Sequence, residues 1–333
     1  MSDYQERLDQ YLNLHSLGST VQQLTQDAST REYFRIRWNK GPAIACVYPE
    51  SFVAAEQTYL DVTRLFRSAK LPVAEVYDFD ASLGVIVQED FGDTIVRSIL
   101  EKSSTAEREK LIDESIELIA QIQAATQLAY DSGSIAGRLK FDTEKLLWEL
   151  NFFKQHYFTT FLKKPLDPEI DAAIETGFKE LSQELETMAT VLCHRDFHAA
   201  NLMLDHQDRI RIIDHQDARI GSPAYDLVSL LLDRITELPS EEWLAEKRRL
   251  LIEDRLHLGM PTIEEDHFGY EFDLQTVQRC LKAAGTFSFQ SANRGKTYFI
   301  PFIKPMFRVV LQAIETLDRF PVLRDVLSQE IAA

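Results

Sequence analysis

The residues of this chain best suited to chemistry lie in the stretch 194–201, which reads His-Arg-Asp-Phe-His-Ala-Ala-Asn. Asn201 follows Asp196 by five residues, and Asp214 follows Asn201 by thirteen, at the end of an apolar run. In this spacing the first Asp accepts a proton from an attacking hydroxyl, while the Asn and the second Asp hold a divalent metal. The pattern predicts phosphoryl transfer with Asp196 as general base and Mg²⁺ on Asn201 and Asp214.

Other interpretations of these residues remain open at this stage. Taken singly, Asp196 and Asp214 are as readily explained as turn residues, because Asp favours turns. His194 and His198 lie four residues apart, as zinc ligands on a helix do, but the Glu of H-E-x-x-H is absent and no third ligand is evident. Paired carboxylates for glycoside cleavage would leave Asn201 without a role. The joint pattern therefore favours phosphoryl transfer.

The first ~90 residues are expected to form a β-rich lobe that carries one helix. After an N-terminal helix, strands are predicted at 21–24, 33–38, 43–48, 73–79 and 84–88. Apolar or small residues recur every three or four positions from Ala55 to Ala69, which predicts one face of a helix that Pro72 ends.

The chain beyond Gly92 is expected to be mainly helical. Helices are predicted around 112–119 and 146–161, and at 223–235, 241–257, 274–287 and 305–319. Short β-like pieces at 191–193, 202–204 and 209–213 interrupt them, with a polar turn at 205–208. The fold class is therefore α+β, with a nucleotide-binding lobe at 1–91 and a catalytic and substrate-binding lobe at 92–333.

Composition and charge disfavour some classes of binding partner for this chain. The net charge of −17, from 36 basic and 53 acidic residues, disfavours nucleic acid and anionic membranes as partners. The N-terminus lacks the features of a signal peptide and no apolar run reaches membrane-spanning length, so we expect a cytoplasmic protein. The three cysteines lie far apart without CxxC spacing and are interpreted as buried structural thiols. The oligomeric state stays open.

A resemblance to a known family rests on several segments. The segments 194–201 and 212–226 resemble the catalytic and metal-binding segments of the aminoglycoside/choline phosphotransferase superfamily, relatives of the protein kinases. Within it, the chain is most similar to the anomeric sugar kinases that act on N-acetylmuramate and N-acetylglucosamine in bacterial cell-wall recycling. Supporting stretches at 27–35, 89–92, 149–153 and 278–287 extend the resemblance over nearly the whole chain. It implies a two-lobed protein-kinase-like fold with ATP and Mg²⁺ as cofactors.

The resemblance also assigns roles to single residues. It makes Asp196 the base, Asn201 and Asp214 the Mg²⁺ ligands, and Asp226 a brace beneath the catalytic loop. Residues 29–33 would cover the ATP phosphates. The hinge whose backbone holds adenine would consist of Gln88, Glu89, Asp90 and Phe91. A helix N-cap is a further reading of Asp226, compatible with the first.

The third predicted strand, 43–48, departs from most of the superfamily because it contains no Lys to hold the ATP phosphates. The anomeric sugar kinases resemble this chain in that lack. Arg31 or Arg35 is expected to supply the missing charge through bidentate contacts, the alternative being a pair of surface charges between strands. Without the Lys, its usual partner Glu56 is expected to face solvent.

Three functions follow from these observations. The leading one is an ATP-dependent kinase for the anomeric hydroxyl of an N-acetylated amino sugar. A kinase for another small alcohol, such as an aminoglycoside or choline, is the alternative within the same fold. A nucleotide-binding pseudokinase scaffold is supported by the absent Lys and opposed by the intact Asp196, Asn201 and Asp214.

Overall fold

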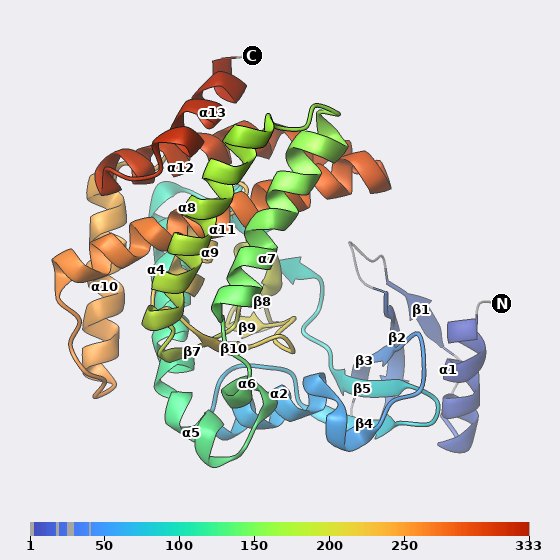
Figure 1. The fold of residues 1–333 in the computed structure, drawn as a ribbon. Helices are drawn as coiled ribbons and strands as arrows, with labels where there is room; N and C mark the ends of the chain where they lie inside the picture. The colour runs from blue at the N-terminus through green and yellow to red at the C-terminus, as the bar shows by residue number, and fades with distance from the viewer. Residues whose placement is uncertain (1–2, 18–19, 25–29, 40, 333) are drawn as a thin grey trace. The chain divides into compact units, whose positions relative to one another are not determined.

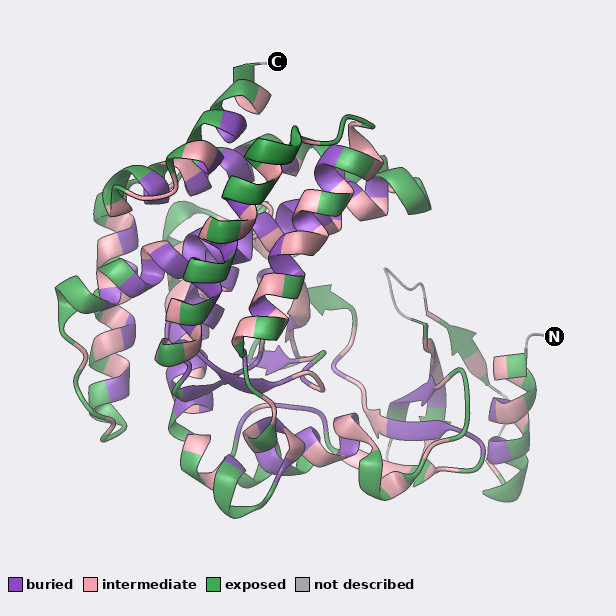
Figure 2. Cartoon of the chain, viewed as in Figure 1, coloured by how far each residue is buried: buried purple, intermediate pink, exposed green. Residues whose placement is uncertain are grey.

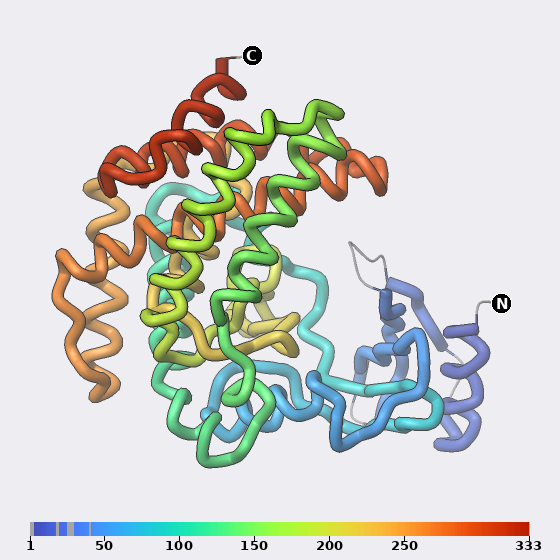
Figure 3. The backbone as a smooth tube through the Cα atoms, viewed as in Figure 1, coloured from blue at the N-terminus to red at the C-terminus, as the bar shows by residue number. Residues whose placement is uncertain are grey.

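The computed structural model describes residues 3–17, 20–24, 30–39 and 41–332. The chain divides into two compact units, and its path through both can be followed in Figure 3. The first unit consists of Met1–Ser104 and Ala199–Asp217. The second consists of Thr105–His198 and Ala218–Ala333. In the described part of the chain, no helix is both long and apolar enough to cross a membrane.

The first unit contains an antiparallel sheet of five strands in the order β1-β2-β3-β5-β4 (Figure 1). The strands are β1 (Val21–Gln23), β2 (Glu32–Trp38), β3 (Gly41–Val47), β4 (Val76–Asp80) and β5 (Val85–Glu89). All five predicted strands are therefore confirmed, although the fourth begins three residues late. Val73, where it was expected to begin, forms only an isolated bridge to Ile212.

The N-terminal helix α1 (Asp3–Leu14) buries one face against this sheet. Its residues Leu8, Tyr11 and Leu12 are 3% exposed or less. The sheet contributes alternate residues to the same core, since successive side chains of a strand point to opposite faces. These are Ala43, Ala45 and Val47 of β3 with Val85 and Val87 of β5.

The helix predicted at 55–69 is shorter than expected. A 3₁₀ turn (Ala54–Glu56) precedes α2 (Thr58–Ser68), and Gln57 caps α2 by accepting a hydrogen bond from the Tyr59 amide. Ala55 was expected in the helix, which is wrong because it lies in the 3₁₀ turn, where it is exposed. Glu56 faces solvent as predicted. The buried face of α2 consists of Tyr59, Leu60, Val62, Thr63, Leu65 and Phe66.

A second sheet in the first unit has the order β6-β8-β9. Its strands are β6 (Thr94–Ile95), β8 (Leu202–Leu204) and β9 (Ile210–Ile212), and the helix α3 (Val96–Leu100) follows β6. The predicted turn between β8 and β9 is present. Asp205 closes this turn because its Oδ1 accepts hydrogen bonds from the amides of Gln207 and Arg209, at 2.9 and 3.1 Å.

The second unit is mainly helical, as predicted. Its helices are α4 (Thr105–Ala124), α5 (Thr126–Asp131), α6 (Ile135–Arg138), α7 (Thr143–Lys154), α8 (Pro168–Met188), α9 (Tyr225–Leu232), α10 (Glu241–His257), α11 (Glu265–Arg294), α12 (Ile303–Leu317) and α13 (Pro321–Ala332). The short strands β7 (Val191–Cys193) and β10 (Arg219–Gly221) pair with each other. Helix α11 has 30 residues and is buried along much of its length (Figure 2).

Several predicted helices of this unit differ from the structure at their ends. The helix at 241–257 is confirmed, and α12 lies two residues before its predicted range. The helix predicted at 223–235 is shorter in the structure, where it is α9. The helix predicted at 274–287 is only the middle of the longer helix α11. The helix expected over 146–161 changes to a π-helix at Gln155–Phe161. The three cysteines are buried and none of them forms a disulfide, which confirms their interpretation as buried structural thiols.

Candidate active site

The loop that carries the predicted base, Asp196, is held by hydrogen bonds to a buried carboxylate of the second unit. Asp226, fully buried in the first turn of α9, accepts hydrogen bonds from the His194 amide at 2.6 Å and from the Arg195 amide at 3.0 Å. Arg195 has a left-handed backbone with φ of 87°, which costs energy for a side chain of this kind. The predicted contact of Asp226 with the loop is present. The N-cap reading is wrong, since Ala224 occupies the N-cap position of α9 and Asp226 lies inside the helix.

Asp196 lies against cationic side chains of α11. The Lys282 ammonium is 2.9 Å from Asp196 Oδ1, and the Arg279 guanidinium is 3.5 Å from the same oxygen. Burial acts to raise the pKa of Asp196, but Lys282, Arg279 and Arg195 outweigh it and hold this pKa well below the usual range. Asp196 is therefore an ionised carboxylate at neutral pH, the form in which it can accept a proton.

Lys282 and Arg279 were not predicted as site residues. They lie three positions apart on α11, so they share one face of the helix. The sequence showed only that the segment 278–287 resembles a family segment. Nothing in a single sequence places position 282 beside position 196.

The two histidines of the loop have different surroundings. His194 is fully buried and packs edge-on against Phe197, with ring centroids 5.5 Å apart. Burial lowers the pKa of His198, which keeps its ring neutral. Among the described residues, no three His, Cys, Asp or Glu side chains are grouped as a metal site would require. The zinc interpretation gains no support from this arrangement.

The predicted Mg²⁺ ligands Asn201 and Asp214 lie at the open end of the β8–β9 hairpin in the first unit. Leu202 pairs with Ile212, and the Ile213 amide donates a hydrogen bond of 3.1 Å to the Asn201 carbonyl. The hairpin therefore brings together two residues that are thirteen positions apart. The Asp214 side chain is 42% exposed. An amide oxygen and an accessible carboxylate are hard donors that fit Mg²⁺, which takes one or two carboxylates plus phosphate and water oxygens.

Helix α2 fixes the residue that follows Asp214. His215 is buried and contacts the rings of Tyr59 and Phe66, at centroid distances of 5.0 and 5.4 Å. Its Nε2 is 2.7 Å from the Thr63 hydroxyl. Asp214 itself has a left-handed backbone with φ of 62°, so this anchoring of its neighbour maintains a conformation that the chain would otherwise seldom adopt.

Arg31 lies beside the strand that has no lysine. Its Nη2 is 3.3 Å from Asp214 Oδ1, and its guanidinium lies over the rings of Tyr33 and Tyr48, at 5.8 and 5.7 Å. Burial acts to lower the pKa of Arg31, but Tyr33, Cys46 and Tyr48 together outweigh it and raise this pKa. A permanent positive charge therefore stands next to a predicted Mg²⁺ ligand. Ser29, the first residue of the predicted phosphate-covering turn, lies outside the described residues.

Arg35 has a different set of partners. It donates two hydrogen bonds to Asp90, at 2.6 and 3.1 Å, and two to Asp93, at 2.8 and 3.1 Å. The Asp90 side chain is only 3% exposed. These bidentate ion pairs connect β2 to the segment that follows β5. Of the two arginines that the sequence singled out, Arg31 is the one beside a predicted metal ligand.

The predicted adenine hinge, Gln88 to Phe91, is held by its own side chains within the first unit. Glu89 accepts a hydrogen bond of 2.7 Å from Arg211, whose guanidinium also lies 3.9 Å from the centre of the Phe91 ring. Gln88 is in register with Ile44 of β3 and Val76 of β4. The role of this segment as an adenine hinge stays a prediction.

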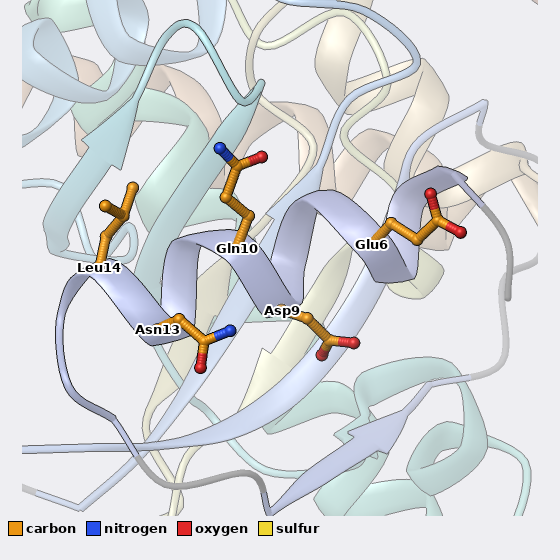
Figure 4. Close-up of a pocket in the computed structure, with 5 residues that line it drawn as sticks. All are labelled: Glu6, Asp9, Gln10, Asn13 and Leu14. Carbon is orange, nitrogen blue, oxygen red and sulfur yellow. The ribbon is translucent and has the colours of Figure 1, made fainter.

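A separate surface hollow lies along α1, as Figure 4 shows. It is lined by Glu6, Asp9, Gln10, Asn13 and Leu14. None of the residues singled out by the sequence lines it, and it opens widely to solvent. It contributes nothing to the predicted chemistry.

Known proteins resemble this chain over most of its length. It is 29% identical over 310 residues to the N-acetylmuramate/N-acetylglucosamine kinase of Neisseria meningitidis serogroup B, covering 91% of this chain and 90% of that one. The protein of the same name from Caulobacter vibrioides is 26% identical over 284 residues, covering 83% and 74%.

The fold is likewise shared. The structure of a choline kinase from Streptococcus pneumoniae superposes with a TM-score of 0.59 and 15% identity, covering 96% of this chain and 100% of that one. The protein-kinase-like α+β fold is thereby established. The profile of the phosphotransferase enzyme family matches residues 20–259 of the 333-residue chain, and the protein therefore belongs to that family and is a phosphotransferase.

Proposed function

We propose that this phosphotransferase uses ATP to phosphorylate the anomeric hydroxyl of N-acetylmuramate or N-acetylglucosamine. The observation that carries the proposal is the ionised carboxylate of Asp196 on a loop braced by Asp226. The names of the two relatives support the acceptor, since both are kinases of these sugars.

Asp196 takes the proton of the acceptor hydroxyl as the phosphoryl group arrives. The pKa of this carboxyl is depressed, so it is a weak base. An anomeric hydroxyl is more acidic than an ordinary alcohol and loses its proton to a weak base more readily. The depressed pKa therefore supports an acceptor of this kind.

Asn201 and Asp214 would hold Mg²⁺, which neutralises charge on the β- and γ-phosphate oxygens when it is bound. Arg31 contacts the nucleotide phosphates and supplies the charge that a lysine on β3 gives in most of the superfamily. The backbone of the segment from Gln88 to Phe91 receives adenine. Arg31 already stands beside Asp214, which supports this role over one as a surface charge.

A cationic acceptor, such as choline or an aminoglycoside, is a poorer fit to the surroundings of Asp196. Arg195, Arg279 and Lys282 are three of the main charges that act on this carboxylate. Cations gathered around the base would repel an acceptor of the same sign. A neutral or anionic sugar avoids that repulsion, which supports the N-acetylated amino sugars.

Two broader assignments complete the proposal. Residues 1–91 would bind the nucleotide, and residues 92–333 would carry the base and bind the acceptor. The enzyme would act in the cytoplasm, where ATP and Mg²⁺ are both supplied.

The test is a panel of acceptors with purified protein, ATP and Mg²⁺. ADP release should depend on N-acetylmuramate or N-acetylglucosamine, and the ³¹P spectrum of the product should show a phosphate on an anomeric carbon. ADP release that depends on choline or an aminoglycoside instead would replace the proposed acceptor. Binding of ATP without turnover on any acceptor would favour the pseudokinase.

A further inference from the structure

Lys282 forms a close ion pair with Asp196. Its ammonium is 2.9 Å from Oδ1, and the side chains of Lys282 and Asp196 are 14% and 29% exposed. Arg279 reaches the same oxygen at 3.5 Å from one turn earlier on α11. Two cations from a single helix face are thus directed at one oxygen of the proposed base.

Helix α11 is a firm support for these two side chains. It is buried along most of its middle, and a Cβ added at Gly285 would lie 2.6 Å from the Cα of Phe153 on α7. Arg279 is itself held by the Ser229 hydroxyl, to which it donates at 2.9 Å. A charge presented from a tightly packed helix can orient its partner as well as attract it.

The charged groups facing Asp196 come from three elements of the second unit. Arg195 and His198 belong to its own loop, Lys282 and Arg279 to α11, and Asp226 to α9. The histidine is neutral, and burial raises the pKa of Asp226 to about 7. The cations therefore dominate, and Lys282 has the largest effect among them on the pKa of Asp196.

We propose that Lys282 is a positioning residue that fixes the carboxylate of Asp196 for proton acceptance and keeps it ionised. The inference rests on the proposed function, in which Asp196 is the base. With Oδ1 held by Lys282, the orientation of the whole carboxylate is set. In the reaction, the acceptor O–H bond breaks, the new O–P bond forms as the bond to ADP breaks, and the proton goes to Asp196. Lys282 keeps its own protons throughout.

The first experiment compares Lys282→Met with Lys282→Arg, which keeps the charge. The Met variant should lose about 10- to 100-fold in kcat, as expected for a misplaced catalytic group, with KM for ATP changing by less than about 3-fold. The Arg variant should recover most of that loss. Lys154→Met is the matched control, because Lys154 is 16% exposed and pairs with Asp171 and Glu175 instead. It should keep kcat within about 3-fold of the wild type.

The pH profile separates positioning from a structural role. Without the Lys282 charge, the pKa of Asp196 rises, so the acidic limb of kcat/KM should move to higher pH in Lys282→Met. It should stay near the wild-type position in Lys282→Arg and Lys154→Met. A loss of activity with an unmoved limb would overturn the proposal. If the Met variant melts at too low a temperature, Lys282→Gln serves the same comparison.

A double variant distinguishes a failure of this inference from a failure of the proposed function. Because Lys282 acts through Asp196, adding Lys282→Met to Asp196→Asn should cost less than about 3-fold further. A full additional loss would show that Lys282 acts elsewhere and would overturn its role as a positioning residue. If Asp196→Asn is itself active, the proposed base is wrong. If Asp196→Asn is inactive while Lys282→Met is fully active, only the positioning inference fails.

Discussion

Single side chains of the candidate site differ in how firmly the fold holds them. Asp226 is fully buried and Asp196 pairs with cations of α11, whereas Asp214 is 42% exposed and accepts hydrogen bonds from Arg31 and Gln216. An exposed carboxylate contributes little to folding, because ion pairs open to solvent are weak. Substitution at Asp214 therefore tests chemistry with little effect on stability.

Asp214→Ala should abolish turnover, and the melting temperature should fall only slightly, because Ala tolerates the left-handed backbone at this position less well than Asp. The variant removes the only carboxylate of the proposed Mg²⁺ pair and leaves the hairpin hydrogen bond between Ile213 and Asn201 in place. Turnover and thermal melting are measured together, with Asp131→Ala on α5 as a surface control. Near-normal turnover at ordinary Mg²⁺ would show that Asp214 is not a ligand.

Arg31→Met should raise the KM for ATP by about 10-fold or more, as expected for loss of a charged hydrogen bond. Arg35→Met should act mainly on stability, since Arg35 pairs with Asp90 and Asp93. Steady-state kinetics against ATP concentration and urea unfolding of both variants separate the two effects. Unchanged ATP kinetics in both variants would remove the proposed compensation for the absent lysine.

At the scale of elements, the β8–β9 hairpin, α9 and α11 position the candidate residues. The hairpin brings Asn201 close to Asp214. Asp226 of α9 accepts a hydrogen bond from the His194 amide and so holds the loop that carries Asp196. Helix α11 supplies the charges of Arg279 and Lys282. Each contact depends on a specific packing feature that can be altered by one substitution.

Asp226→Asn should destabilise the second unit by about 1–3 kcal/mol. The Asn side chain has one oxygen, so the amides of His194 and Arg195 can no longer both be satisfied. Urea unfolding measures the loss, and Asp266→Asn on the exposed first turn of α11 is the control. An unchanged unfolding midpoint would mean that the brace contributes nothing to stability.

Two glycines of α11 form a matched pair. Gly285→Ala should destabilise by about 1–3 kcal/mol, because its Cβ would overlap the backbone of Phe153. At Gly269 an added Cβ meets nothing within 4 Å, so Gly269→Ala should stabilise by about 0.4–1 kcal/mol. Unfolding midpoints of both variants check the pair. Equal effects would contradict the close approach of α7 and α11.

How far the sequence alone predicts these elements depends on how local their signal is. Strands β1 to β5 were predicted because alternation and turn residues lie within a few positions. Helix α8 was missed although Asp167 caps it and its buried residues Ile174, Phe178, Leu181 and Leu185 follow helical spacing. The motif around Asp196 was visible in the sequence. Its contact with Lys282 was not, because it joins residues 86 positions apart.

At the scale of the whole molecule, the chain passes between its two units within the motif itself. His198 is the last residue of one segment and Ala199 the first of the next, so Asp196 belongs to the second unit and Asn201 to the first. The hairpin 199–217 thus groups with residues 1–104, although it follows them by almost a hundred positions. The assignment of nucleotide binding to 1–91 and acceptor binding to 92–333 stays a prediction.

The measurement that tests the account most directly is made on Asp196→Asn. This variant preserves shape and removes the basicity of the carboxylate, so kcat should fall by about 10²- to 10⁴-fold, at the low end for an acidic anomeric hydroxyl. The Kd for ATP and the melting temperature, measured on the same preparation, should change little. An active variant, or one that is inactive only because it is unfolded, would contradict Asp196 as the base.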